Sequence, residues 1–365
     1  MESGDHGTAS CFPRIAFLGC RWRLWLDSHF GLVSGVCKAW GMPENLAYYA
    51  EAAARIAPYV RRTPLFTARV DGRKVSFKLE NLQVAGVFKI RGALNALLAQ
   101  REATESGHTA DARVVTASGG NHGLGVATAA RWLDVPATVY VPETVPDIKA
   151  ARIAAAGADV VKTGRVYADA ERAAREFAAG QGLYYVHAYD DPAVVAGQGT
   201  VGLEIEADLP ECDVVAVPVG GGGLLAGVSG ALAAIERAAA AETATAAGSA
   251  PRRVVGVEPE GCPTLHAAVE AGEPVDVGAD SVAASALGAA RIGDLAFSAY
   301  RANPVGLALV SDKEIIAARD RLWEDFRLAV EPAAATVFAA WLAGQVPGAH
   351  PCLVLSGANA TWTPA

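Results

Sequence analysis

Lys89 is the residue whose type and setting most directly indicate chemistry. It lies between Phe88 and Ile90, after a strand-like run and before leucines at helical spacing, so we expect it near the start of a helix. Apolar neighbours partly desolvate a lysine, which lowers the pKa of its amine and favours the neutral nucleophile that forms an imine. A lysine with a buried stem and a solvated ammonium group is the alternative. This stretch alone leaves both interpretations open.

A run of four glycines, Gly220 to Gly223, followed by Leu224, is the second candidate. It comes directly after the apolar run Val214–Val219 and before a helical pattern. Backbone N–H groups left bare at a helix start form a cradle for a phosphate. The run lacks the Lys-Ser/Thr ending of a nucleotide P-loop, which favours a phosphate outside a triphosphate. A tight turn requires one or two glycines and explains four less well.

A second loop, Ser118-Gly119-Gly120-Asn121-His122, also lies between a predicted strand and a predicted helix. Its small residues allow backbone N–H groups to reach a carboxylate, and the amide of Asn121 suits a ring hydroxyl. For His122 we favour a capping or packing role over a catalytic one. The loop therefore predicts contacts to an anionic, partly aromatic ligand.

Ser356 opens a third loop, Ser356 to Asn359, which follows the predicted strand 352–355. Its hydroxyl could face a heteroaromatic nitrogen, although alone this would be an ordinary turn. An imine-forming lysine, a phosphate cradle and this hydroxyl together predict a site for pyridoxal 5′-phosphate, which supplies an electron sink.

Six motifs together resemble the serine/threonine dehydratase (threonine ammonia-lyase) family of fold-type II pyridoxal-phosphate enzymes. They occur in the family's order and cover about residues 45 to 360. They are the segments at 88–93, 118–122, 197–200, 220–223, 257–261 and 356–359.

The resemblance implies a role for each matching residue. The implied cofactor contacts are Phe88, Lys89, Asn121, Gly220, Gly221, Gly222, Gly223, Leu224, Glu331 and Ser356. The implied substrate contacts are Ser118, Gly119, Gly120, Asn121 and His122. Lys89 would bind the cofactor and remove the substrate α-proton, Asn121 would bond the cofactor's 3-hydroxyl, and Ser356 its pyridine nitrogen.

The activity implied is β-elimination from L-threonine, L-serine or a related 3-hydroxy amino acid, giving a 2-oxo acid and ammonia. A serine racemase, a β-replacement synthase of specialised metabolism and a non-catalytic ligand-binding protein are the alternatives. Gly119 stands where racemases of the family carry serine, which favours elimination. Val87 replaces the family's usual serine and Ala358 a frequent glycine, and Val87 in particular suggests a specialised substrate.

Strand-like and helical patterns alternate from residue 73 onward and predict an α/β protein of doubly wound type. The family resemblance implies the fold-type II (tryptophan synthase β-like) form of it, with two doubly wound open-sheet domains. We predict a large cofactor-binding domain (42–110 and 190–365), a small domain (111–189) and an N-terminal extension (1–41) dispensable for activity. The predicted strands are 75–79, 113–116, 137–141, 159–162, 183–187, 213–218, 253–257, 307–310 and 352–355. The predicted helices are 46–57, 123–133, 148–156, 168–179, 224–240 and 313–323.

The net charge, the apolar runs and the cysteine spacing limit the classes of partner and the compartment that we expect. The 365 residues carry a net charge of -8 and no block of Lys or Arg, which argues against nucleic acid and anionic membranes. No apolar run looks long and uninterrupted enough to span a bilayer. The six cysteines lack metal-type spacing and predict a reduced, cytoplasmic protein. We expect an amino-acid substrate, a homodimer and no metal, since Thr264 stands where metal-binding relatives carry an acid, six residues after Glu258.

Overall fold

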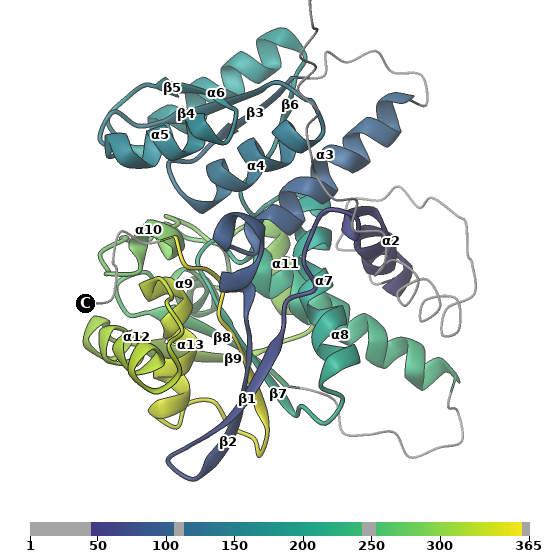
Figure 1. The fold of residues 1–365 in the computed structure, drawn as a ribbon, viewed down its shortest axis with the longest axis vertical. Helices are drawn as coiled ribbons and strands as arrows, with labels where there is room; N and C mark the ends of the chain where they lie inside the picture. The colour runs from purple at the N-terminus through teal and green to yellow at the C-terminus, as the bar shows by residue number, and fades with distance from the viewer. Residues whose placement is uncertain (1–44, 106–112, 243–252, 360–365) are drawn as a thin grey trace, which may run out of the picture. The chain divides into compact units, whose positions relative to one another are not determined.

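The computed structural model describes residues 45–105, 113–242 and 253–359. The predicted extension at 1–41 lies outside these residues. Within them, strands and helices alternate along the chain as predicted (Figure 1).

Ten described strands form two sheets. The six-stranded sheet has the order β1 (Leu65–Val70), β2 (Arg73–Lys78), β10 (Pro351–Val354), β7 (Val214–Pro218), β8 (Arg253–Pro259) and β9 (Gly306–Val310). Only β1, at its edge, runs antiparallel to its neighbour. The four-stranded parallel sheet has the order β5 (Asp159–Lys162), β4 (Ala137–Val141), β3 (Val114–Ala117) and β6 (Tyr184–Tyr185). Its strands all fall within 111–189, whereas the division into two domains stays a prediction.

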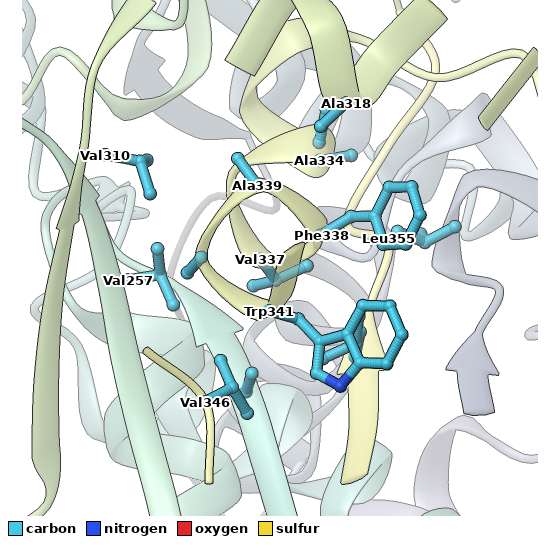
Figure 2. Close-up of a cluster of buried hydrophobic side chains, with 14 of the residues drawn as sticks. Val257, Val310, Ala318, Ala334, Val337, Phe338, Ala339, Trp341, Val346 and Leu355 are labelled. Atoms are coloured by element: carbon cyan, nitrogen blue, oxygen red, sulfur yellow. The ribbon is translucent and has the colours of Figure 1, made fainter. Parts of the chain in front are cut away.

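Helices cover both faces of the six-stranded sheet. Val214 and Val257 pack with α12 (Asp312–Phe326) and α13 (Pro332–Leu342), and Figure 2 shows Val257 and Val310 beside α13. The alternate residues Val215 and Val217 pack with α7 (Pro192–Asp208), α8 (Gly223–Glu242) and α11 (Asp294–Ala302) on the other face. Burial on both faces explains why these strands read as continuous apolar runs.

The four-stranded sheet is covered in the same way. Val114 and Val139 pack with α4 (Asn121–Trp132) and α5 (Asp147–Ala155), and Val115 and Tyr140 pack with α6 (Tyr167–Gln181). Helix α3 (Lys89–Glu105) contacts both α4 and α7. The remaining α-helices are α2 (Leu46–Ile56), α9 (Thr264–Ala271) and α10 (Ala284–Leu287).

Several elements were absent from the sequence prediction, and α7 is the most instructive. From Val194 to Ile205 every residue of α7 is buried, including three glycines, so the helix has no polar face to give an amphipathic period. Its start nevertheless carries a readable signal. Asp191 caps it by accepting from the N–H groups of Ala193 and Val194, and Pro192 occupies its first turn.

Helix α8 corrects the expectation about apolar runs. Its stretch Gly223–Ala241 has the length and composition of a membrane span, with a mean hydropathy of 1.4. More than half of it is buried inside the structure, where Leu225, Val228 and Leu232 pack against α7 and the sheet. The same apolar composition is what a core helix between two layers requires.

A network of buried charges ties α3 to the large sheet. The guanidinium of Arg91 donates to both carboxylate oxygens of Glu80 at 2.8 Å, and to those of Glu204 at 2.8 and 3.0 Å. Lys78 donates to Glu204 and to the carbonyl of Thr63. All four charged side chains are less than 5% exposed. Two cations and two anions therefore neutralise one another in the core, at the helical turn that begins with Lys89.

Candidate active site

Lys89 is the first residue of α3, which confirms the predicted helix start. Its Nζ donates to the carbonyl of Ala188 at 2.7 Å and lies 5.2 Å from the ring centroid of Phe88. Desolvation lowers the pKa of the Lys89 ammonium to about 8. A substantial fraction of neutral amine is thus available near physiological pH, unlike for a lysine with a solvated head.

The segment before Lys89 is hydrogen-bonded to the loop from Ser356 to Asn359. Val87 pairs with Gly357 in an isolated antiparallel bridge, and the N–H of Phe88 donates to the carbonyl of Ser356 at 3.2 Å. The N–H of Ala358 donates to the carbonyl of Gly86 at 2.9 Å. These bonds bring residues separated by some 270 positions in the chain into one ligand-facing surface.

One cavity gathers residues from every predicted cofactor-binding segment. Phe88, Lys89, Asn121, Gly220 to Leu224, Glu331 and Ser356 all line it. Of the predicted substrate contacts, only Asn121 does so. Ser118, Gly119, Gly120 and His122 lie outside its lining, and their predicted roles stay untested by this geometry.

The four glycines pack more tightly than a turn requires. A Cβ at any position from Gly220 to Gly223 would lie 2.8 Å or less from another element, because Leu287, Tyr189 and Ala296 approach them closely. Packing therefore accounts for all four glycines, which corrects the expectation that a structural role explains only one or two. The run alone is weaker evidence for a phosphate than the sequence indicated.

The backbone N–H groups of this loop supply independent evidence for an anion. From Gly220 to Leu224, none of them finds an acceptor within the part of the chain that the structure describes. They lie at the start of α8, where the positive end of the helix dipole adds to their attraction for negative charge. The donors fit the phosphate of pyridoxal 5′-phosphate, with Lys89 lining the same cavity.

Glu331 is a buried acid on the wall of this cavity, 3% exposed. Its Oε1 accepts from Nδ2 of Asn121 at 2.7 Å. Desolvation raises the pKa of the Glu331 carboxyl to about 7, and the bond from Asn121 only partly opposes this shift. The carboxyl therefore exchanges a proton near neutral pH.

The loop after β3, Ser118 to His122, differs from the glycine loop in that its own side chains form hydrogen bonds. Oγ of Ser118 accepts from the N–H of Gly120 at 3.2 Å, and a Cβ at Gly119 would lie 2.5 Å from Cγ2 of Val145. Nε2 of His122 lies 3.1 Å from the carbonyl of Val186, and desolvation lowers the pKa of the buried ring to about 3. A neutral ring on a backbone carbonyl agrees with the packing role favoured for His122.

The sequence analysis missed four residues of the cavity lining: Tyr189, Pro218, Ala286 and Leu287. Tyr189 places its ring over Gly221 and meets the ring of His187 edge to face at 4.7 Å. It follows a predicted strand of the small sheet, and that position gave a usable signal, because ligands bind beyond the carboxyl ends of parallel strands.

Glu258 is buried, and hydrogen bonds satisfy it. Its carboxylate accepts from the N–H groups of Leu265 and His266 at 2.7 and 3.0 Å, and lies 3.0 Å from Oγ1 of Thr264 and 2.7 Å from Nδ1 of His266. Glu258 is therefore a hydrogen-bonded acid within the core. Among the residues in view, no cluster of three His, Cys, Asp or Glu is arranged for a metal.

Comparison with known proteins places this geometry in context. The model of the family described as "Pyridoxal-phosphate dependent enzyme" matches residues 56–357. An L-threonine ammonia-lyase from Geobacter sulfurreducens is 39% identical over 317 residues, which cover 85% of this chain and 74% of that protein. The crystal structure of a threonine deaminase from T.th. has a TM-score of 0.76 at 34% identity, covering 88% of this chain and all of that one. Maize serine racemase has a TM-score of 0.75 at 29% identity, covering 87% and 94%.

Proposed function

The chain belongs to the family of pyridoxal-phosphate dependent enzymes, and from this membership we propose that it is an ammonia-lyase acting on L-threonine, L-serine or a related 3-hydroxy amino acid. The products would be ammonia and a 2-oxo acid. One observation carries the proposal: a lysine amine of lowered pKa lines the same cavity as a helix start whose N–H groups have no acceptor among the described residues.

Most of the predicted cofactor contacts that line the cavity have a place in this activity. The N–H groups of Gly220 to Leu224 would bind the cofactor phosphate, Phe88 would pack by its ring and Ser356 would face its nitrogen. When bound, pyridoxal 5′-phosphate supplies the electron sink that stabilises negative charge at the substrate Cα. Lys89, once freed by the substrate amine, would remove the α-proton as general base. Glu331 lies within the same wall.

The substrate would be oriented by the loop after β3. We assign its carboxylate to the backbone N–H groups of Gly119 and Asn121, with His122 supporting the loop. The N–H groups of Ser118 and Gly120 already donate to the carbonyl of Tyr140 and to Oγ of Ser118. Loss of the α-proton and of the β-hydroxyl then gives an enamine, which releases ammonia in water. The small residues of this loop suit close approach of a carboxylate to backbone N–H groups.

The first test replaces the lysine. Lys89→Ala should reduce 2-oxo acid release by about a thousandfold or more, because one amine is both the tether and the base. Its visible cofactor absorption should also be lost. Lys162→Ala, which removes an exposed lysine paired with Asp147, is the matched control and should keep full activity. Comparable turnover by the Lys89→Ala variant would overturn the assignment.

The second test separates elimination from racemisation. With L-serine we expect pyruvate and little D-serine, because Gly119 has no side-chain proton to return to the substrate. A serine at 119 would collide with Val145, so Gly119→Ser should gain racemisation only together with Val145→Ala. Chiral chromatography of the products measures both. D-serine accumulating faster than pyruvate in the unaltered enzyme would favour the racemase instead.

We further propose a homodimeric enzyme of the cytoplasm. The buried thiols of Cys212, Cys262 and Cys352 suit a reducing compartment. Sedimentation equilibrium of the purified chain tests the first proposal, and fractionation of cells that express it tests the second.

A further inference from the structure

Asn359 is a polar residue beside the cavity for which the sequence analysis gave no role. Its Nδ2 donates to the carbonyl of Ala85 at 2.8 Å and to Oδ1 of Asn121 at 3.1 Å. Nδ2 of Asn121 in turn donates to Oε1 of Glu331 at 2.7 Å. Two side-chain amides thus connect a backbone carbonyl to the buried acid of the cavity wall.

The carbonyl of Ala85 sets the direction of this chain. A backbone carbonyl only accepts, so Asn359 must present its NH₂ group to it. The second hydrogen of that group then points toward Asn121, whose side-chain oxygen must accept it. Asn121 consequently turns its NH₂ group toward Glu331, and a reversed Asn121 would oppose two donors at one end and two oxygens at the other.

The backbone holds the Ala85 carbonyl in place. Ala85 and Gly86 both adopt left-handed conformations, with φ of 60° and 69°, and the N–H of Ala358 secures the carbonyl of Gly86. A Cβ at Gly86 would lie only 3.0 Å from Oδ1 of Asn359. The strained pair therefore aims one carbonyl at Asn359 and leaves room for its amide.

We propose that Asn359 is a positioning residue that acts through Asn121. It fixes the Asn121 amide so that one N–H binds Glu331 and the other is available to a ligand in the cavity that Asn121 lines. This rests on the proposed function, in which that ligand is pyridoxal 5′-phosphate. Asn359 itself need not touch the cofactor.

A double-mutant cycle on cofactor affinity tests the proposal. The Kd for pyridoxal 5′-phosphate is measured by absorbance titration of cofactor-free protein for the unaltered chain, Asn359→Ala, Asn121→Ala and the double variant. We expect Asn359→Ala to weaken binding about tenfold in the unaltered background, the equivalent of one directed hydrogen bond. In the Asn121→Ala background the same change should alter Kd by less than about twofold.

Equal ratios in the two backgrounds, or an unchanged Kd in Asn359→Ala, would overturn the proposal. Asn359→Asp keeps the shape but removes both donors, so it should also weaken binding even if the alanine variant unfolds. The control is Asn95→Ala, which removes a buried asparagine bonded to Ala193 and Arg55. It should lower thermal stability without changing Kd.

The experiment distinguishes a failure of the role proposed for Asn359 from a failure of the proposed function. The cycle measures binding rather than turnover, so tight cofactor binding without ammonia release would remove the activity and leave the role of Asn359 standing. Absence of cofactor binding by the unaltered chain would remove both. Catalysis by the unaltered chain with additive effects of Asn121 and Asn359 would remove this role alone.

Discussion

Buried charged side chains occur in two places near Lys89, around Arg91 and at Glu331, and they are balanced in opposite ways. Around Arg91, two cations and two carboxylates satisfy one another with short hydrogen bonds. Glu331 is equally buried, yet the one hydrogen bond that its carboxyl group makes to a described residue comes from a neutral amide, and the pKa of this carboxyl rises to about 7. Complete pairing makes a rigid foundation, whereas incomplete pairing leaves a group that a ligand or a proton can still change.

Breaking the paired set should have the largest effect. Arg91→Met leaves Glu80 and part of Glu204 buried without a cation, so we expect the free energy of unfolding to fall by about 3–5 kcal/mol. Urea denaturation of the cofactor-free protein measures it. The control is Arg321→Met on the surface, where the pair with Asp71 should contribute little, because solvent screens both charges. Equal losses for the two variants would contradict the comparison.

Neutralising the unpaired acid should have the opposite sign and depend on pH. The folded carboxyl of Glu331 has a pKa of about 7 against an ordinary 4.5, so the folded state holds the extra proton between these values. Stability is therefore lost progressively as pH rises from about 4.5 to about 7, and the loss is complete above 7. Glu331→Gln should be more stable than the unaltered chain at pH 8, by roughly 3 kcal/mol at most, and similar to it near pH 4.5. A difference independent of pH would refute this.

Thr200 lies beside the network of Lys78, Glu80, Arg91 and Glu204, and replacing it should destabilise the fold less than replacing Arg91 does. Oγ1 of Thr200 accepts from Arg91 at 3.2 Å and donates to the carbonyl of Gly197 at 2.7 Å. Thr200→Val keeps the shape and removes both bonds, so we expect a loss of about 1–2 kcal/mol. Thr128→Val, which removes a single bond within α4, serves as the reference in the same denaturation experiment and should cost less.

Glu258 is a fourth buried acid, and its surroundings lead us to expect no effect of metal ions on activity. Its oxygens are occupied by backbone N–H groups, Thr264 and His266, which supply no second carboxylate for a hard cation. Activity should be unchanged by chelation and by later addition of magnesium or calcium. Several-fold activation in an ammonia-release assay would show that these partners give way to an ion.

Local patterns made the central parts of this fold predictable. The strands β4 (Ala137–Val141) and β5 (Asp159–Lys162) match their predicted ranges, because their apolar residues form short runs between glycine or helical signals. Lys89 and the glycine loop could be identified because the strand-like and helical patterns on either side of them are adjacent in sequence. The cavity does collect the predicted cofactor contacts.

The parts that escaped prediction depend on contacts distant in sequence. Nothing near Asn359 indicates that its amide meets Ala85, 274 residues earlier. The same holds for Arg91 and Glu204, which are 113 residues apart. The close packing of Tyr189 on Gly221 likewise becomes visible only in the folded chain. From the sequence, the four glycines were therefore interpreted as evidence for a ligand, although close packing explains them equally well.

The place of β10 has a consequence for synthesis on the ribosome. This strand lies between β2 and β7 in the sheet, and the loop after it fastens the Lys89 segment. Some 270 residues must therefore be translated after Lys89 before its surroundings are complete, which takes roughly 15 to 55 seconds at ordinary elongation rates. Until then β2 and β7 lack the strand between them. The nascent chain cannot assemble the cofactor site, and loading should follow release from the exit tunnel.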